Sequence, residues 1–254
     1  ERLMTLWKSR QDNPERLGIT SLPDFRDWKA ASRSFESLAI LDSAGRGYNL
    51  GGAPDPEQVL GLRVTASFFD VLGVPPLIGR TFTEDEETPG RDHVVVLSHE
   101  LWTRCYGADP GILGRTIRID GEPFEVIGVM PPSFRFQFWS GPRQLWVPAG
   151  WTAGDQERTS NSFICIGRLK PGVTLAQAQA EMDAIGRALA DANPEANAGS
   201  TVRVVPMQEY GMGSLRAGLL VLLAVVGFVL LIACANIANL LLARAAIRQR
   251  ELAV

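Results

Sequence analysis

One stretch of the chain carries no charged side chain. Residues 217–243 contain no Asp, Glu, Lys, Arg or His, and 16 of these 27 residues are Leu, Ile, Val or Phe. At about 1.5 Å per residue, a helix of this length reaches roughly 40 Å and crosses a hydrocarbon core about 30 Å thick. A buried core helix rarely stays uncharged for so long, and a lipid-anchor tail is not normally followed by three arginines. The stretch therefore predicts a transmembrane helix at residues 217–243.

The charges beside this predicted span set its orientation. The last eleven residues, which include Arg244, Arg248 and Arg250, carry a net charge of +2. Because positive flanks are retained in the cytoplasm, we expect residues 244–254 to be the start of a cytoplasmic segment. Residues 1–216 then lie in the periplasm or the extracellular space. A domain of this length needs an earlier span or a signal sequence to be exported, so we expect a fragment of a longer, multi-pass protein.

Small residues share one face of the predicted span. Gly227, Ala235 and Ala238 recur at helical spacing, and such residues let a second helix approach closely. Asn236 and Asn239 lie three residues apart and can hydrogen-bond across that contact. The alternative is that both asparagines reach interfacial water. We favour helix packing, since a single-span anchor needs neither feature.

The part before the span is mildly acidic. Residues 1–216 hold 22 Lys and Arg against 27 Asp and Glu, a net charge of −5. A nucleic-acid-binding domain needs clustered positive charge, so this function is excluded. The chain is 46% hydrophobic and contains three cysteines, which also excludes a disordered chain and a disulfide-stabilised scaffold.

The apolar periodicity of residues 1–216 alternates between strand and helix patterns. Ser21 starts an amphipathic helix that carries Phe25, Trp28, Ala31 and Phe35, and residues 45–56 are rich in turn residues. The expected helices further along begin at residues 67, 98 and 174. The expected strands are 1–10, 37–41, 58–64, 94–97, the hairpin 116–129, 163–169 and 201–205. The pattern predicts a mixed α+β domain with aromatic loops (Phe134, Phe136, Phe138, Trp139, Trp146 and Trp151) over its core.

No motif for catalysis, cofactor binding or metal binding stands out. Ser98, His99 and Glu100 are adjacent on a helix and point about 100° apart, so an N-cap role for Ser98 is the better interpretation. The acidic run 84–87 lacks the alternation of a calcium loop and predicts a solvated loop. Cys105 and Cys165 allow one disulfide, but isolated thiols are favoured. The chain has no Gly-Lys dipeptide and hence no P-loop.

Several segments, taken in order, resemble the permease of a MacB-type ABC transporter. One of them is Leu22-Pro-Asp-Phe-Arg-Asp-Trp28, and another is Val64-Thr-Ala-Ser-Phe-Phe-Asp-Val-Leu-Gly73. The others are residues 33–36, 79–82, 95–98, 101–102, 113–115, 127–132, 168–174 and 231–244. The resemblance implies a MacB-like periplasmic core domain, followed by the start of the FtsX-like permease region.

The resemblance also implies an architecture and a set of partners. Two sequence-separated βαβ-like units, 1–55 and 151–216, would form one subdomain, and a mostly-β subdomain, 56–150, would be inserted between them. The implied partners are an ABC ATPase subunit that binds ATP, a second permease copy or half, the membrane and a periplasmic adaptor. No cofactor is expected in this chain.

The function that we expect is mechanical rather than catalytic. The outer domain would couple cytoplasmic ATP hydrolysis to a conformational change outside the membrane, for export or mechanotransmission. One alternative is a membrane-tethered ligand-binding or sensor domain, which predicts a defined pocket. Another is a tethered hydrolase, which would need a triad built around His93 or His99.

Overall fold

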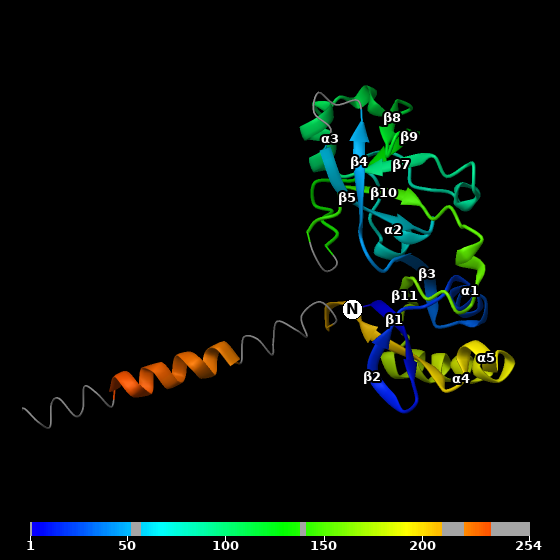
Figure 1. Cartoon of the computed structure of the whole chain (residues 1–254), viewed down its shortest axis with the longest axis vertical. Helices are drawn as coiled ribbons and strands as arrows, with labels where there is room; N and C mark the ends of the chain where they lie inside the picture. Colours follow the sequence, from blue (N-terminus) through cyan, green and yellow to red (C-terminus); the bar gives the residue numbers. More distant parts are fainter. Residues whose placement is uncertain (1, 52–56, 138–140, 210–220, 235–254) are drawn as a thin grey trace, which may run out of the picture. The chain divides into compact units, whose positions relative to one another are not determined.

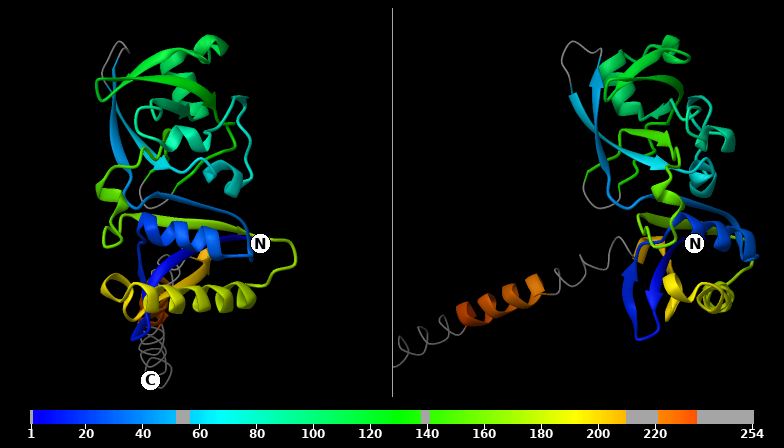
Figure 2. Two further views of the ribbon diagram at one scale, coloured as in Figure 1. Left: turned by 90° about the vertical axis from the view of Figure 1, so that its right-hand side faces the viewer. Right: turned by 45° about the vertical axis from the view of Figure 1, so that its right-hand side comes forward.

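The computed structural model describes residues 2–51, 57–137, 141–209 and 221–234. The chain forms two compact units, Glu1–Met207 and Gln208–Val254. The first unit contains two β-structures, which share contacts at a junction (Figure 1). In both views of Figure 2, one of these structures, built mainly from residues 57–137, lies at one end of the unit, and residues 13–18 and 175–197 lie at the other end.

The first structure, called the base sheet here, has four strands and two crossing helices. In spatial order the strands are β3 (Phe35–Asp42), β11 (Phe163–Leu169), β1 (Leu3–Arg10) and β12 (Ser200–Pro206), each antiparallel to its neighbour. The helices are α1 (Leu22–Ala31), between β1 and β3, and α4 (Leu175–Ala192), between β11 and β12. Each β-α-β unit is thus split by a strand of the other, which is the ferredoxin-like arrangement. The hairpin strand β2 (Asn13–Gly18) pairs with β1, and α5 (Pro194–Asn197) precedes β12.

Both helices pack on one face of the base sheet. Phe25 and Trp28 of α1 and Ala178 and Met182 of α4 are buried in one cluster with the apolar residues of the four strands. Ser21 caps α1, as predicted, because its Oγ accepts the backbone N–H of Asp24. The helix ends at Ala31, so Phe35 lies at the start of β3 and not on the predicted helical stripe.

The second structure is a closed ring of six strands, called the ring here. Its strands, in order around the ring, are β10 (Leu145–Pro148), β7 (Val94–Leu97), β9 (Glu122–Val129), β8 (Thr116–Ile119), β4 (Arg46–Gly51) and β5 (Glu57–Val64), and a β5–β10 pairing closes it. Short elements flank the ring: α2 (Phe68–Leu72), β6 (Ile78–Gly79) and α3 (His99–Tyr106). Closure leaves the ring without a free edge strand.

Local sequence rules account for several ring elements. The predicted hairpin is confirmed, with Asp120 and Gly121 at φ 52° and 89° between β8 and β9. Two positive φ angles match the right-handed twist of the flanking strands. Strand β4 was not predicted, because glycines at both ends made residues 45–56 resemble a turn. Its Tyr48 and Leu50 lie in the ring core. We expected residues up to 55 to belong to the βαβ subdomain, but the hydrogen bonds of β4 to β5 and β8 place it in the ring.

Aromatic side chains fill the space beside the ring. Phe68 and Phe69 of α2 contact Phe136, Trp146, Phe134 and Phe82, with ring centroids 5.1–5.9 Å apart. The predicted aromatic loop over the core is confirmed for Phe134 and Phe136, whereas Trp146 lies in strand β10 and is itself part of the buried interior. Trp151 instead contacts Phe163 of the base sheet, and Phe138 and Trp139 lie outside the described residues.

The described part of the second unit is helical at residues 221–234. Its large apolar side chains are exposed, for example Leu223 at 73% and Phe228 at 69%. Among residues 2–51, 57–137, 141–209 and 221–234, no helix is both long enough and apolar enough to cross a membrane.

Candidate functional site

Most of the predicted helix-packing and topology residues fall outside the described residues. These are Ala235, Asn236, Ala238 and Asn239 of the packing face, and Arg244, Arg248 and Arg250 of the flank. Gly227 is described, and a side-chain carbon at its position would have no atom within 4 Å. The proposed contact with a second helix therefore remains a prediction.

Ser98 has the capping role that the sequence predicted. Its Oγ accepts the backbone N–H of Leu101 at 3.1 Å, which satisfies one of the unpaired donors at the start of α3. The His99 ring faces Trp102, with ring centroids 5.6 Å apart, and lies 3.4 Å from the Oγ1 of Thr103. The three adjacent residues thus do not form a catalytic relay.

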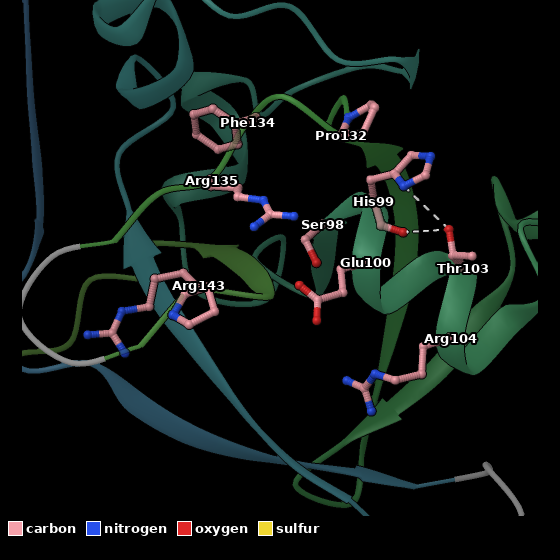
Figure 3. A pocket seen from close by; sticks show the side chains of 10 residues that line it. Ser98, His99, Glu100, Thr103, Arg104, Pro132, Phe134, Arg135 and Arg143 are labelled. Atoms are coloured by element: carbon pink, nitrogen blue, oxygen red, sulfur yellow. Dashed lines mark hydrogen bonds between the residues drawn. The ribbon is translucent and has the colours of Figure 1, made fainter.

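The start of α3 borders an open pocket of about 360 Å³ (Figure 3). Arg104, Arg135 and Arg143 line it together with His99 and Glu100. In Figure 3 the side chains of Arg135 and Glu100 lie on the same side of the helix start. Pro132, Phe134 and Pro142 add apolar surface to the lining. The three arginines suit an anionic group on a small molecule.

The cysteines and the acidic run have structural roles. Cys105 and Cys165 are both free, as favoured from the sequence, and burial raises the pKa of each thiol. Residues 84–87 form a short 3₁₀ helix in which Glu86 bonds the backbone N–H of Thr83 and pairs with Arg80 at 2.7 Å. Within the described ranges, no three His, Cys, Asp or Glu side chains are grouped to hold a metal ion.

The strand register places the two ends of the first unit side by side. Met4 pairs with Pro206, so the start of β1 and the end of β12 leave the base sheet together. The chain connects to the ring at the opposite ends of the strands, after Asp42 and before Phe163, which pair with each other. For a strand of eight residues, these two ends lie about 23 Å apart. The base sheet therefore lies between the two ends of the first unit and the ring.

A cluster of charged side chains joins the base sheet to the ring. Arg63 of β5 donates from Nη2 to Asp42 at 3.1 Å and from Nη1 to Asp155 at 3.3 Å. Its guanidinium also lies over the ring of Phe163, 5.7 Å from the centroid. The side chains of this junction cluster (Arg63, Asp42 and Asp155) are only 10–21% exposed. They come from β5, the end of β3 and the segment that returns to β11.

The two carboxylates of the junction cluster are not equivalent. Burial raises the pKa of Asp42, and the charge and hydrogen bonds of Arg63 offset this effect only in part. Burial also acts to raise the pKa of Asp155, but hydrogen bonds from the backbone and hydroxyl of Thr152 and the charge of Arg63 lower it overall. Asp42 is thus the carboxylate that takes up a proton first on acidification.

Further hydrogen bonds, outside the junction cluster, reinforce the junction. The Oγ1 of Thr65 accepts the backbone N–H of Ile40 at 3.0 Å, where β5 ends beside β3. Glu87 accepts from the backbone N–H of Ala66 at 2.7 Å and from Trp151 Nε1 at 3.1 Å. The Glu87 carboxylate therefore ties the segment that follows β5 to the segment that leads from the ring to β11.

A second buried charge cluster holds the base together. Asp24 is 1% exposed and accepts from Lys8 at 2.9 Å, Arg158 at 2.6 Å and Asn197 at 2.9 Å. Burial acts to raise the pKa of Asp24, but the hydrogen bonds from Asn197 and Lys8 lower it overall. This cluster links α1 to β1, to α5 and to the segment before β11.

Neither charge cluster was predicted from the sequence. Arg63 is separated from Asp42 by 21 residues and from Asp155 by 92 residues. The available signal was an arginine among the apolar residues 59–64 of this strand, since a buried charged residue needs a partner. The identity of that partner depends on the tertiary structure.

Three solved structures are among those that resemble this chain. The first is a domain of a putative permease protein from Porphyromonas gingivalis (17% identity, TM-score 0.58, 81% of this chain and 90% of that one). The second is the periplasmic region of MacB from Actinobacillus actinomycetemcomitans (17%, 0.55, 84% and 92%). The third is the extracellular domain of the noncanonic ABC-type transporter YknZ from Gram-positive bacteria (18%, 0.55, 79% and 99%). At these identities the likeness shows a shared fold.

A comparison with curated proteins gives no match. The family model described as the MacB-like periplasmic core domain matches residues 1–185, which is more than half of the chain. This match agrees with the resemblance noted in the sequence segments and with the shared fold. The chain belongs to the family of MacB-like periplasmic core domains.

Proposed function

We propose that this chain is part of an ABC transporter permease and that its first unit transmits movement from the membrane to the ring. One observation carries the proposal: the two ends of the first unit leave the base sheet as a pair, at Met4 and Pro206, while the ring connects at the other ends of the strands. A displacement applied to the two ends of the first unit must pass through the base sheet and the junction, to which the junction cluster contributes, to reach the ring. The family match supports the transporter setting.

The membrane attachment is part of the same proposal. Residues 217–243 would form the span, with residues 1–216 outside the membrane and Arg244, Arg248 and Arg250 in the cytoplasm. Of this segment, the structure describes residues 221–234, which are helical. ATP would bind to a partner ATPase subunit. A second permease copy or half would pack against the face that includes Gly227, and a periplasmic adaptor would be a further partner.

The proposal is tested with the full-length protein in vesicles together with its ATPase subunit. Co-purification of a nucleotide-binding subunit is the first expected result. The second is that ATP binding changes the amide hydrogen exchange of β1 and β12 and of the segments around Asp42 and Asp155. Arg63→Met should leave ATP hydrolysis intact but abolish the exchange change in the ring. Failure to find an ATPase partner, or the same exchange in every nucleotide state, would refute the proposal.

The pocket beside α3 supports a second candidate, a ligand-binding or sensor domain. Its lining with Arg104 and Arg135 provides donors for an anionic ligand. This candidate function predicts saturable binding of a ligand. Arg135→Ala should weaken that binding and leave the ATP-dependent change in hydrogen exchange unaffected. A small-molecule screen by thermal shift, with Arg187→Ala as an exposed control on α4, separates the two candidates. No stabilising ligand would count against a sensor.

A further inference from the structure

The base sheet ends at strand β12, which pairs only with β1 among the described strands. The N–H and C=O groups of successive residues in a strand point to opposite sides. Those of Val202 and Val204 point away from β1 and therefore face outward. An edge strand of this kind is a template on which another strand can add. Its residues Thr201, Val202, Val204 and Val205 are β-branched and favour such pairing.

One side chain of α4 occupies the outer edge of β12. Gln179 donates from Nε2 to the backbone oxygen of Val202 at 2.7 Å, and its Oε1 accepts the backbone N–H of Val204 at 2.8 Å. A residue in a neighbouring parallel strand makes the same pair of bonds, to a C=O and to the N–H two residues further on. The side-chain amide of Gln179 thus takes the place of one peptide group of a missing strand.

The orientation of this amide is fixed by a neighbour on the same helix. Gln179 Nε2 also donates to Asp183 Oδ1 at 2.8 Å. A carboxylate only accepts hydrogen bonds, so the nitrogen of the amide must face Asp183 and its oxygen must face the N–H of Val204. This is the only orientation of the Gln179 amide in which, for all three hydrogen bonds, a donor meets an acceptor.

Helix α4 is held at the opposite margin of the base sheet as well. Glu181 accepts the backbone N–H groups of Arg33 at 2.8 Å and Ser34 at 2.9 Å, directly before β3. Between these two polar contacts, Ala178 and Met182 are buried against the sheet. The helix is thereby fixed across the sheet, and Gln179 is presented to the edge of β12 by a rigid element.

We propose that Gln179 closes the β12 edge and prevents strand addition by a second copy of this chain. A second copy is the relevant partner because the edge is self-complementary: two β12 strands related by a two-fold axis pair antiparallel. Loss of the amide would free the outward groups of Val202 and Val204 for that pairing. Any contact between copies of the native chain then uses a surface other than this edge.

The test compares Gln179→Ala and Gln179→Met with the native full chain in detergent. The control is Gln177→Ala, the same change two residues earlier on α4, which removes the capping box with Thr174 but no bond to β12. Amide exchange at Val204 should rise several-fold in both Gln179 variants and stay unchanged in the control. Light scattering after size-exclusion chromatography should show a mass that rises with concentration in the Gln179 variants only. The methionine variant keeps the side-chain length, so it reports on hydrogen bonding if the alanine variant folds poorly.

Each contrary result overturns a stated part of the proposal. Native exchange at Val204 in the methionine variant would show that bulk, and not hydrogen bonding, closes the edge. Faster exchange at Val204 in the Gln179 variants, together with a molar mass equal to that of the Gln177→Ala control at every concentration, would show that an open edge does not recruit a second copy. Equal association of the Gln177→Ala variant would assign the effect to general loss of stability.

Discussion

Removal of the Arg63 guanidinium is expected to destabilise the first unit and to weaken the junction cluster specifically. In Arg63→Met, the apolar stem remains but Asp42 and Asp155 lose their shared cation. Breaking a buried ion pair by removing one partner costs about 3–5 kcal/mol. Because these side chains retain 10–21% exposure, we expect a loss of about 2–4 kcal/mol in the free energy of unfolding.

The assay is urea unfolding of the full chain in detergent, followed by tryptophan fluorescence. All six tryptophans lie at or before Trp151, so the signal reports on the first unit. The matched control is Arg2→Met, which removes an exposed pair with Glu36, 2.9 Å apart and 38% and 52% exposed. Such pairs contribute about 0–1 kcal/mol, so the control should lose little stability.

Two further measurements separate a charge effect from lost side-chain contacts. Asp42→Asn in the Arg63→Met background should recover about 1 kcal/mol, because it removes the uncompensated charge. The stability deficit of Arg63→Met should also shrink as the pH falls. The folded pKa of Asp42 is already raised by burial, and a proton on this carboxyl relieves the repulsion from Asp155. Two results would refute the conclusion that charge stabilises the junction. One is a loss of unfolding free energy in Arg63→Met no larger than that in Arg2→Met, and the other is strict additivity of the effects of Arg63→Met and Asp42→Asn.

The other predictions concern one buried carboxylate, two glycines and two cysteines. Asp24→Asn should lower the free energy of unfolding by about 3–5 kcal/mol at neutral pH. The folded pKa of Asp24 lies below its usual 3.8, so the stability difference between the variant and the native protein, measured by urea unfolding, should shrink only as the pH falls below about 3.8. Gly79→Ala should destabilise by more than about 2 kcal/mol, since a Cβ at φ +75° would lie 2.2 Å from a carbonyl oxygen. Gly90→Ala, at φ +87° with nothing within 4 Å of the added carbon, should cost only about 1 kcal/mol of backbone strain. Equal shifts of the melting temperature in the Gly79→Ala and Gly90→Ala variants would contradict this difference. Native-state maleimide labelling with peptide mapping should modify the half-buried Cys105 well before the fully buried Cys165, and equal rates would contradict the burial of Cys165.

Local rules predicted most helices and strands of the first unit. A capping box of Thr174 and Gln177 starts the helix expected at residue 174, Gly73 ends α2 at φ 67°, and the β8–β9 hairpin turns at Asp120. In each case, the determining interaction lies within a few residues of the signal. Strand β4 was missed because its glycines have a turn-like composition, and its strand state depends on pairing with β5 and β8.

The candidate site was much less predictable than the fold. The expected packing residues Asn236 and Asn239 lie outside the described residues and stay predictions. The junction cluster went unpredicted, because Arg63, Asp42 and Asp155 are brought together only when β3, β5 and the returning segment meet. Periodicity predicts the buried face of an element, but it does not predict the partner of a buried charge.

By itself, the sequence determined the local elements, the acidic character of residues 1–216, the uncharged segment 217–243 and the family. These properties depend on residue type and short-range spacing, which any single chain displays. Only the tertiary structure decided that the two ends of the first unit pair at Met4 and Pro206, that six strands close into a ring, and that Gln179 occupies the β12 edge. Each of these results depends on contacts between residues far apart in the chain, whose free energy is gained only when the separate elements dock.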